Sequence, residues 1–317
     1  MTKETEYAIE VEKLTKRYGK FLAVNNISFN VRRGEVFALL GPNGAGKTTT
    51  VEIIETIRRP TLGKVRLLGM DVTKKKHAIV PCIGVLPQGF SSFDRITVRE
   101  TMQYYSRLFG SRHVDIDELI ALVNLTDKAK EQYTTLSGGL KQRLGIAIAL
   151  VNDPEVVFLD EPTTGLDPRA RREVWDVLLG LKKKGKTVFL TTHYMEEAEL
   201  LADTVTIISN GTTIAMGSPD QLIESNADYL VLTLQSVDEK AFEVIGKMGF
   251  EPDQNNDKTI HVRVAHTDDI RKILNAIQDA GASFRSMDVR KPNLEEVFLK
   301  LTGEALHQGA DGEKGAQ

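Results

Sequence analysis

The sequence has little of what secreted or membrane-embedded chains contain. Its 317 residues include one cysteine, Cys82, so no internal disulfide can form. A lone cysteine fits a reducing cytosol, where it is more often a packing residue than a nucleophile. The uncharged apolar run at residues 144–151 is far shorter than the roughly 18 residues that a membrane-spanning helix needs. If the chain acts at a membrane, we expect another chain to form the path across it.

The charge pattern excludes further classes. The net charge at pH 7 is −3, so the chain lacks the basic excess that non-specific binding to nucleic acid requires. Residues 1–10 carry charges of both signs and no apolar run, so we expect no signal peptide. Apolar residues make up 41% of the chain and charged residues 27%, which is ordinary for globular proteins. The length suffices for two domains with a large core.

Strand-like and helix-like segments alternate up to about residue 225. An alternating pattern predicts an exposed strand at 9–14, and Asn210-Gly211 predicts the tight turn of a hairpin. Short apolar runs predict buried strands, and longer segments predict helices between them. The predicted buried strands are 35–40, 156–160 and 187–191, and the helices are 47–57 and 168–184. This alternation favours an α/β domain with a largely parallel sheet.

The remaining sequence predicts a second, smaller domain. After a connection at 218–228, its expected order is strand 229–235, helix 239–248, strands near 250 and at 259–264, helix 267–280, strand 283–289 and helix 293–301. This β-α-β-β-α-β order resembles a ferredoxin-like α+β domain. We therefore predict domains at 1–225 and 226–303, followed by a disordered tail at 304–317.

A phosphate-binding pattern follows the buried strand at 35–40. The pattern G-x-x-x-x-G-K-[ST] is matched by Gly41-Pro42-Asn43-Gly44-Ala45-Gly46-Lys47-Thr48, and a helix is predicted directly after it. Glycines let several backbone N–H groups point at one anion, and the helix N-terminus adds positive potential. Lys47 would bind the β- and γ-phosphates of ATP and Thr48 would ligate Mg²⁺, with Thr49 beside them. The alternative is an ordinary glycine-rich turn.

Two adjacent acids end the buried strand at 156–160. Successive side chains of a strand point to opposite faces, so Asp160 and Glu161 can have different roles. We expect Asp160 to hold Mg²⁺, directly or through water, and Glu161 to orient or activate the attacking water. The alternative is that both acids cap the helix beyond Pro162.

Just upstream of this strand lies Leu136-Ser137-Gly138-Gly139-Leu140-Lys141-Gln142-Arg143, the segment on which the chain resembles an ABC ATPase. The resemblance spans residues from about 8 to 225. It implies an ABC-type P-loop ATPase domain with mixed sheets, which precedes the ferredoxin-like domain. The family's order of motifs is completed by Tyr18, by Gln88 in Pro87-Gln88-Gly89, by Asp167 in Gly165-Leu166-Asp167 and by His193 in Thr191-Thr192-His193.

The resemblance implies a role for each of these residues within one copy of the chain. Tyr18 would stack on adenine, although outside this context it would be an ordinary tyrosine at a strand end. The Gln88 side chain would reach Mg²⁺ or water, and its loop would lead toward a transmembrane partner. His193 would contact the γ-phosphate, and so would act with Glu161 and Gln88 as a catalytic residue.

The resemblance also implies that a second copy of the chain completes each site. Ser137, Gly138 and Gly139 would bind the γ-phosphate of ATP held by the opposite copy, because they begin a helix. Ser137 would also serve as the N-cap of that helix. Asp167 would face the phosphate-binding residues of the partner copy.

Two features point to a branch of the family. Leu140 stands where many members have Gln, and an aliphatic residue there is familiar among drug-resistance exporters. The segment 291–303 resembles the ending that such ATPases share, although its apolar positions also suit an internal amphipathic helix. The resemblance thus implies an ATPase on the cytoplasmic side of the cell membrane that powers export through a separate ABC-2-type permease.

Two alternatives remain open. One is a non-transport ABC ATPase that acts on nucleic acid or ribosomes. Those chains carry tandem cassettes or a long coiled-coil insert, and this sequence has neither, so we expect no nucleic-acid partner. The other makes the C-terminal domain a small-molecule sensor that regulates the ATPase.

Overall fold

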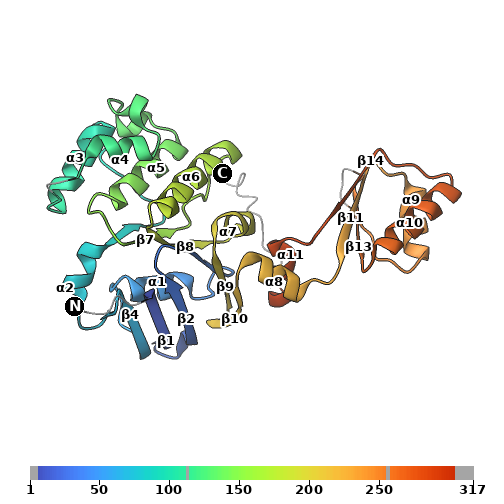
Figure 1. Cartoon of the computed structure of the whole chain (residues 1–317), viewed down its shortest axis with the longest axis horizontal. Coiled ribbons are helices and arrows are strands. Elements are labelled where there is room, and N and C mark those ends of the chain that lie inside the picture. The colour runs from blue at the N-terminus through green and yellow to red at the C-terminus, as the bar shows by residue number, and fades with distance from the viewer. Residues whose placement is uncertain (1–5, 112–113, 255–257, 304–317) are drawn as a thin grey trace, which may run out of the picture. The chain divides into compact units, whose positions relative to one another are not determined.

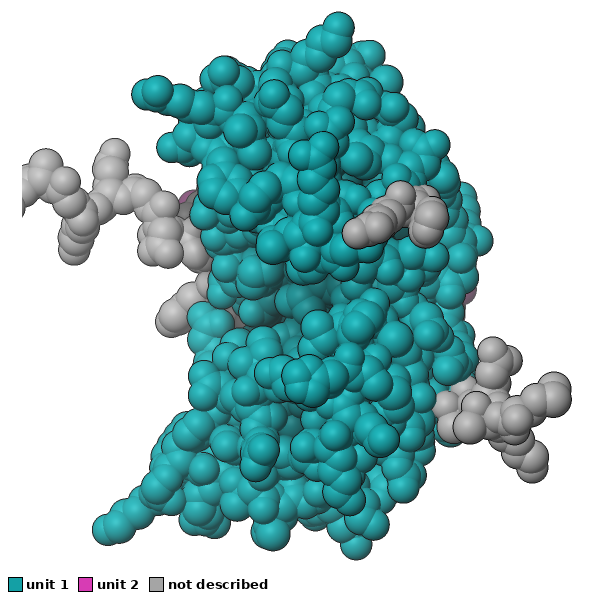
Figure 2. Space-filling model, turned by 90° about the vertical axis from the view of Figure 1, so that its left-hand side faces the viewer, with its two compact units in different colours: residues 1–219, 301–317 teal, residues 220–300 magenta. Residues whose placement is uncertain are grey.

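The computed structural model describes residues 6–111, 114–254 and 258–303, so the tail predicted at 304–317 lies outside the described residues. The chain divides into two compact units, and Figure 2 shows one face of the first of them, in teal. Unit 1 comprises residues 1–219 and 301–317, and unit 2 comprises residues 220–300. The sequence-based boundary after residue 225 falls six residues beyond this division, near the end of helix α8 (Pro219–Asn226).

The central sheet of unit 1 has six strands in the order β10-β9-β3-β8-β7-β6. Strand β3 pairs in parallel with β8 and β9, and β7 pairs in parallel with β6 and β8. The strands are β3 (Val36–Leu40), β6 (Ile83–Leu86), β7 (Val156–Asp160), β8 (Thr187–Thr192), β9 (Thr204–Ser209) and β10 (Thr212–Gly217). Every residue of β3 and β8 is buried, which explains the unbroken apolar run of β3 and the apolar centre of β8, residues 188–190. The prediction of a mixed, largely parallel sheet with a hairpin at Asn210-Gly211 is confirmed.

A second, antiparallel sheet of unit 1 has the order β2-β1-β4-β5. Its strands are β1 (Tyr7–Tyr18), β2 (Phe21–Arg32), β4 (Leu62–Leu67) and β5 (Met70–Asp71). The strand expected at 9–14 is longer because β2 pairs with it along its whole length, with several register shifts. Phe29 of β2 stacks on Phe37 of β3 with ring centroids 5.0 Å apart, so aromatic packing joins the two sheets into one core.

Figure 1 shows α3 to α6 grouped on one side of the central sheet, with the β1–β2–β4 sheet on the other. The helices of unit 1 are α1 (Lys47–Ile54), α2 (Lys76–Ile79), α3 (Val98–Leu108), α4 (Ile116–Leu122), α5 (Gly138–Ala149), α6 (Pro168–Lys183) and α7 (Met195–Leu201). The helix predicted at 47–57 ends earlier because Thr56 has a φ of 67°, which is left-handed and breaks the helix. Within the described ranges, no helix has the length and apolarity needed to cross a membrane.

Unit 2 contains a four-stranded antiparallel sheet in the order β12-β13-β11-β14. Its elements run β11 (Leu230–Gln235), α9 (Glu239–Lys247), β12 (Asp253–Gln254), β13 (Ile260–Val264), α10 (Thr267–Asp279), β14 (Ser286–Arg290) and α11 (Leu294–Thr302), which is the predicted β-α-β-β-α-β order with an extra helix. Leu232, Ile245 and Ile273 belong to one buried cluster, so α9 and α10 cover a face of the sheet. The connection expected at 218–228 was wrong: residues 219–226 form α8, whose Leu222 and Ile223 are buried.

Candidate functional site

The phosphate-binding residues 41–48 form the turn that follows β3 and the first two residues of α1, as the sequence predicts. Gly46 has a φ of 100°, and a Cβ atom there would lie 2.5 Å from the carbonyl oxygen of Ala23, so only glycine fits. Gly44 also has a positive φ, 82°. Asn43, Gly44 and Thr48 are exposed, and Ala45 is buried beneath them. The turn therefore presents its tip and the first residues of α1 to an incoming ligand.

Lys47 lies inside this turn. Its side chain is only 6% exposed, and its Nζ donates hydrogen bonds to the carbonyl oxygens of Gly41 (2.8 Å) and Pro42 (3.2 Å). Burial lowers the pKa of Lys47, whereas the charges of Glu161 and Asp160 oppose that change. These interactions hold the ammonium group beside the two acids, where the phosphates of a nucleotide would need a positive charge.

Asp160 and Glu161 leave the end of β7 in different directions. The hydroxyl of Thr191, on the neighbouring strand β8, donates to Oδ1 of Asp160. The backbone N–H of Glu161 donates to the carbonyl oxygen of Thr191 over 3.0 Å. Glu161 has a φ of 49°, in the left-handed region that non-glycine residues rarely adopt. Such strain is typical of functional turns, and here it directs the two carboxylates apart.

The other two predicted catalytic side chains, Gln88 and His193, both lie beside the Glu161 carboxylate. Gln88 Nε2 donates to its Oε2 over 3.0 Å, and His193 Nδ1 lies 3.4 Å from its Oε1. Thr164 Oγ1 also donates to Oε2, over 3.1 Å. The contact with His193 holds the pKa of Glu161 below its usual range, although burial opposes this effect. The carboxylate is therefore ionised at neutral pH and can accept a hydrogen bond from water.

The side chains near the phosphate-binding turn have the chemistry that Mg²⁺ requires. Asp160 offers a carboxylate, and the exposed Thr48 offers a hydroxyl beside the phosphate-binding turn. Among the described residues, no group of three or more His, Cys, Asp and Glu side chains could hold an ion by itself. Mg²⁺ is usually held by only one or two protein oxygens, because water and substrate phosphates supply its other ligands. The few oxygen donors of this site therefore suit Mg²⁺. Gln88 donates to Glu161 through its Nε2 atom, and the role of its amide oxygen as a further ligand of Mg²⁺ stays a prediction.

Ser137, Gly138 and Gly139, which begin α5, make no described bond to the phosphate-binding turn of the same chain. Ser137 is the N-cap of α5 and accepts a hydrogen bond from the N–H of Leu140, as expected. A Cβ atom at Gly139 would lie 2.7 Å from Cβ of Ala170, so a glycine is needed where α5 approaches α6. In the part of the chain that the structure describes, no hydrogen bond or ion pair joins Ser137, Gly138 or Gly139 to residues 41–49.

Asp167 and Tyr18 also lie at exposed positions. Asp167 caps α6 by accepting hydrogen bonds from the N–H groups of Arg169 and Ala170, both over 2.9 Å. Tyr18 ends β1 and is 39% exposed. Lys16 Nζ lies 5.0 Å from the Tyr18 ring centroid and the Arg58 guanidinium lies 5.7 Å from it. The ring is thus accessible to a flat ligand, in a positively charged environment.

Three further residues belong to this site, although the sequence analysis assigned them no role. Thr191 bonds to both acids, Thr164 bonds to Glu161, and the Tyr194 ring lies 4.2 Å from the His193 ring. The sequence signal for these residues was the threonines that follow Glu161 and those that precede His193. Their partners depend on the pairing of β7 with β8, which a pattern within one segment does not reveal.

A buried acid beneath the site should make stability depend on pH. Glu55, at the end of α1, has a pKa raised to about 8 by burial, by Asp160 and by Glu52. The unfolded state loses this proton near pH 4.5 but the folded state keeps it until about pH 8, so stability falls between these values. Glu55→Gln should therefore gain on the order of 3 kcal/mol over the wild type at pH 8 and little at low pH.

Denaturant unfolding at both pH values would measure this difference. The control is Glu12→Gln, a change at an exposed position of β1 that should alter stability equally at both pH values. An equal gain for Glu55→Gln at both pH values would contradict the assignment of the buried, protonated acid.

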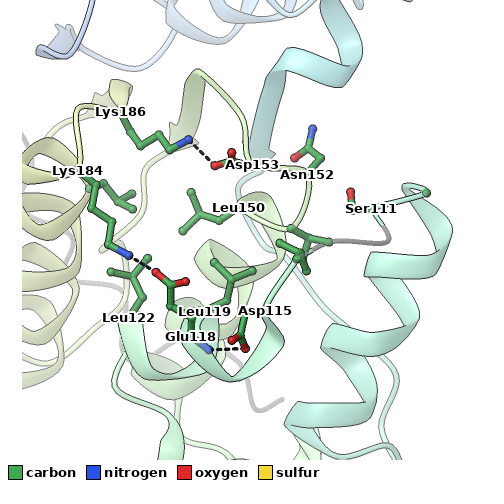
Figure 3. Close-up of a pocket in the computed structure, with 14 residues that line it drawn as sticks. Ser111, Asp115, Glu118, Leu119, Leu122, Leu150, Asn152, Asp153, Lys184 and Lys186 are labelled. Carbon is green, nitrogen blue, oxygen red and sulfur yellow. Dashed lines mark hydrogen bonds and ion pairs between the residues drawn. The ribbon is translucent and has the colours of Figure 1, made fainter.

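A cavity of about 510 Å³ lies elsewhere in unit 1, between α4, the end of α5 and the end of α6 (Figure 3). None of the predicted site residues lines it. Its two lysines are already paired: Lys184 Nζ lies 2.8 Å from Glu118 and Lys186 Nζ lies 2.6 Å from Asp153. The cavity therefore offers no charge that a nucleotide would need, and the candidate site stays at the ends of β3, β7 and β8.

Comparison with known proteins agrees with this geometry. A family model described as "ABC transporter" matches residues 24–164. The daunorubicin resistance ATP-binding protein DrrA3 of Streptomyces coeruleorubidus is 37% identical over 304 residues, covering 94% of this chain and 96% of that protein. The Nod factor export ATP-binding protein I of Rhizobium meliloti (strain 1021) is 39% identical over 304 residues, with coverages of 94% and 89%.

Solved structures are also similar. CbiO1 of Clostridium perfringens, part of the ABC transporter complex CbiONQ, has a TM-score of 0.62 at 27% identity and covers 69% of this chain and 92% of its own. MJ0796, described as a bacterial ABC transporter cassette in a dimeric structure, has a TM-score of 0.59 at 27% identity, with coverages of 66% and 98%. Neither match extends over the whole chain, so the ferredoxin-like assignment of unit 2 stays a prediction.

The phosphate-binding turn, the acids of β7 and the full-length relatives agree with one another. The chain belongs to the ABC transporter family, as an ATP-hydrolysing subunit.

Proposed function

We propose that this ATPase powers export through a separate membrane permease of the ABC-2 type. Two full-length relatives are named for drug resistance and for Nod factor export, and both similarities span nearly the whole chain. No described helix is suited to crossing a membrane, so the path for the exported substrate would belong to the permease. The chain would then act on the cytoplasmic side of the cell membrane. These names give no support to the nucleic-acid alternative.

One observation carries the link between ATP hydrolysis and a permease. Gln88 donates a hydrogen bond to Glu161 at the hydrolytic end of β7, and the chain leads from Gln88 directly to an aromatic surface. We define this aromatic surface as Phe93, Tyr104, Tyr105 and Phe109. Phe93 and Tyr104 are 50% and 44% exposed, and their ring centroids lie 5.0 Å apart in an edge-to-face arrangement. A helix docked there would be in contact with the segment that positions Glu161.

The same surface includes a shallow apolar pocket. Phe93, Asp94, Arg95, Ile96 and Tyr104 line about 490 Å³ of space. Exposed aromatic side chains of this kind, with charged residues at the edge, are typical of protein interfaces. Tyr105 is half-buried and its ring packs against those of Tyr104 and Phe109, whereas the half-buried Phe90 packs edge-to-face on Tyr133. Permease docking at residues 88–109 is therefore our proposal for the partner site.

We further propose that two copies close head to tail around two ATP molecules. Ser137 is exposed and lacks a described contact with its own phosphate-binding turn, so its helix N-terminus is available to a partner copy. Each site would combine Lys47, Thr48, Asp160, Glu161 and His193 of one copy with Ser137 and Gly139 of the other. The dimeric structure of MJ0796 supports this arrangement by similarity.

Hydrolysis would depend on positioning and on charge. Lys47 and the N–H groups of residues 41–48 would hold the phosphates, and Glu161 would orient water toward the γ-phosphate. Mg²⁺, held by Thr48 and Asp160 with the phosphates, would spread the negative charge that develops. His193 would contact the γ-phosphate from its place beside Glu161.

The docking proposal predicts where crosslinks form. A benzoylphenylalanine introduced at Phe93 or Tyr104 should crosslink under light to a co-expressed ABC-2-type permease, because both side chains are exposed on the proposed surface. The matched control is the same probe at Phe21, another exposed aromatic residue, which begins β2. Crosslinks at Phe21 that are as strong as those at Phe93 and Tyr104 would contradict the placement. Mass spectrometry of the crosslinked band would identify the site.

A further inference from the structure

Glu197, on α7, is a buried acid to which the mechanism above assigns no task. Its side chain is 0% exposed. Its Oε1 accepts hydrogen bonds from Thr163 Oγ1 over 2.9 Å and from Trp175 Nε1 over 3.1 Å. Its Oε2 is also buried, and no hydrogen bond from a described residue reaches it. Burial raises the pKa of Glu197, which favours the neutral acid, although interactions with Thr192, Thr163 and Trp175 oppose this change.

Stability does not explain an acid at this place. Burying a carboxyl group with one oxygen unpaired costs free energy, and apolar residues of similar volume usually replace such groups at no loss. Glu197 is the second acid of the α7 sequence Met195-Glu196-Glu197-Ala198, and its neighbour Glu196 is exposed. We therefore look for a function of Glu197 in the two residues that its Oε1 atom connects, Thr163 and Trp175.

The hydrogen bond from Thr163 joins the two segments that carry Glu161 and His193. Strands β7 and β8 pair up to Asp160 and Thr191, and the N–H of Glu161 still bonds to Thr191. Beyond that point the two segments leave the sheet. Thr163 follows Glu161 by two residues, and α7 begins two residues after His193. The bond from Thr163 to Glu197 connects the two segments again, because Thr163 follows Glu161 and Glu197 follows His193 in the chain.

Helix α6 supports the segment that carries His193 and Glu197 from one face. Arg171 and Trp175 are four residues apart on α6, so they lie on the same face. Trp175 donates to Glu197, and the Arg171 guanidinium lies 4.3 Å from the centroid of the Tyr194 ring. The Tyr194 ring in turn lies 4.2 Å from the His193 ring. The orientation of His193 and the position of α7 thus depend on the same helix.

We propose that Glu197 is a positioning residue for ATP hydrolysis: its bond with Thr163 fixes α7 against the loop that follows Glu161. This bond sets the spacing between the Glu161 carboxylate and the His193 ring, which lie 3.4 Å apart. The proposal rests on the assignment of Glu161 and His193 as the hydrolytic pair. Glu197 itself touches neither substrate nor the reacting atoms.

The test uses variants that remove one hydrogen bond at a time in the full-length protein. Thr163→Val keeps the shape of the side chain but removes its hydroxyl, so kcat should fall at least about tenfold while KM for ATP changes less than about twofold. Glu197→Leu should lower kcat likewise. Glu197→Gln should restore most of the activity, because its amide oxygen can accept both bonds. Glu196→Gln, at the exposed neighbouring acid, is the control.

Fluorescence separates positioning from damage to the fold, because Trp175 is the only tryptophan of the chain. Thr163→Val leaves the bond between Trp175 and Glu197 in place, so its emission should match that of the wild type although its kcat falls. Glu197→Leu removes the acceptor of the indole N–H, so its emission should shift. A shifted spectrum in Thr163→Val would show a disturbed core and would count against positioning.

Two results would overturn the proposal in different ways. Wild-type kcat in Thr163→Val, beside an inactive Glu161→Gln variant, would reject the role of Glu197 alone. Near-normal hydrolysis by Glu161→Gln would reject the hydrolytic pair, and the positioning role with it. A lower melting temperature in Glu197→Leu with unchanged kcat would leave Glu197 a purely structural residue, and the proposal would be wrong.

Discussion

Glu161→Gln should keep ATP binding and lower kcat by roughly two to four orders of magnitude. The amide keeps the size of the side chain and an oxygen that can still accept a bond from Gln88 or Thr164. It loses the negative charge that the contact with His193 helps to maintain, so it cannot polarise the attacking water. Phosphate release at saturating Mg-ATP would measure this loss.

Bound ATP that is not hydrolysed should also hold two copies together. Sizing chromatography of Glu161→Gln with Mg-ATP should show a dimer, because the nucleotide itself contributes much of the contact between copies. Glu196→Gln, at the exposed position on α7, should behave as the wild type in both assays. Near-normal hydrolysis by Glu161→Gln would remove Glu161 from the catalytic role.

Local patterns predicted the parts of the site that depend on one strand and the turn after it. Residues 41–48 lie after β3 and at the start of α1 because a buried run, glycines with positive φ and a helix follow each other in the sequence. Asp160 and Glu161 end β7 for the same reason. Parallel strands place their carboxyl ends at one edge of the sheet, so the sequence could also predict that these groups meet.

Contacts between distant segments could not be predicted. Gln88 bonds to Glu161 across 73 positions of the chain, and Thr163 bonds to Glu197 across 34. An acid in a Glu-Glu-Ala-Glu helix is normally exposed, and it is the packing of α7 against other elements, α6 among them, that buries Glu197. The extension of β1 to Tyr18 likewise depends on its partner β2, since pairing rather than local pattern sets the end of a strand.

The second unit shows the same limit on a larger scale. Its order of strands and helices was readable from alternation and helical periodicity, because each element has one face to bury. The helix α8 was missed because the Pro, Ser and Asn residues around it are typical of a connection. Two buried apolar residues, Leu222 and Ile223, outweigh those signals in the folded chain.

Lys47→Ala should weaken nucleotide binding, the step that precedes hydrolysis. It removes a buried ammonium group that bonds to Gly41 and Pro42 and that would bind the β- and γ-phosphates. A hydrogen bond to a charged group contributes about 1.5–3 kcal/mol, so the affinity for Mg-ATP should fall about tenfold to a hundredfold. Isothermal titration calorimetry would measure the dissociation constant. Lys64→Ala, at an exposed position of β4, is the control and should bind normally.

The two variants separate binding from hydrolysis when they are compared in one assay. Lys47→Ala should fail to form the ATP-dependent dimer, because it lacks the bound nucleotide that joins the copies, whereas Glu161→Gln should accumulate it. Loss of the lysine also frees the carbonyl oxygens of the turn, so thermal unfolding without nucleotide should be recorded beside the affinity. Unchanged nucleotide affinity in a folded Lys47→Ala protein would contradict the assignment of residues 41–48 as the phosphate-binding turn. A dimer that forms with ATP in both variants would show that contacts other than the phosphates hold the copies together.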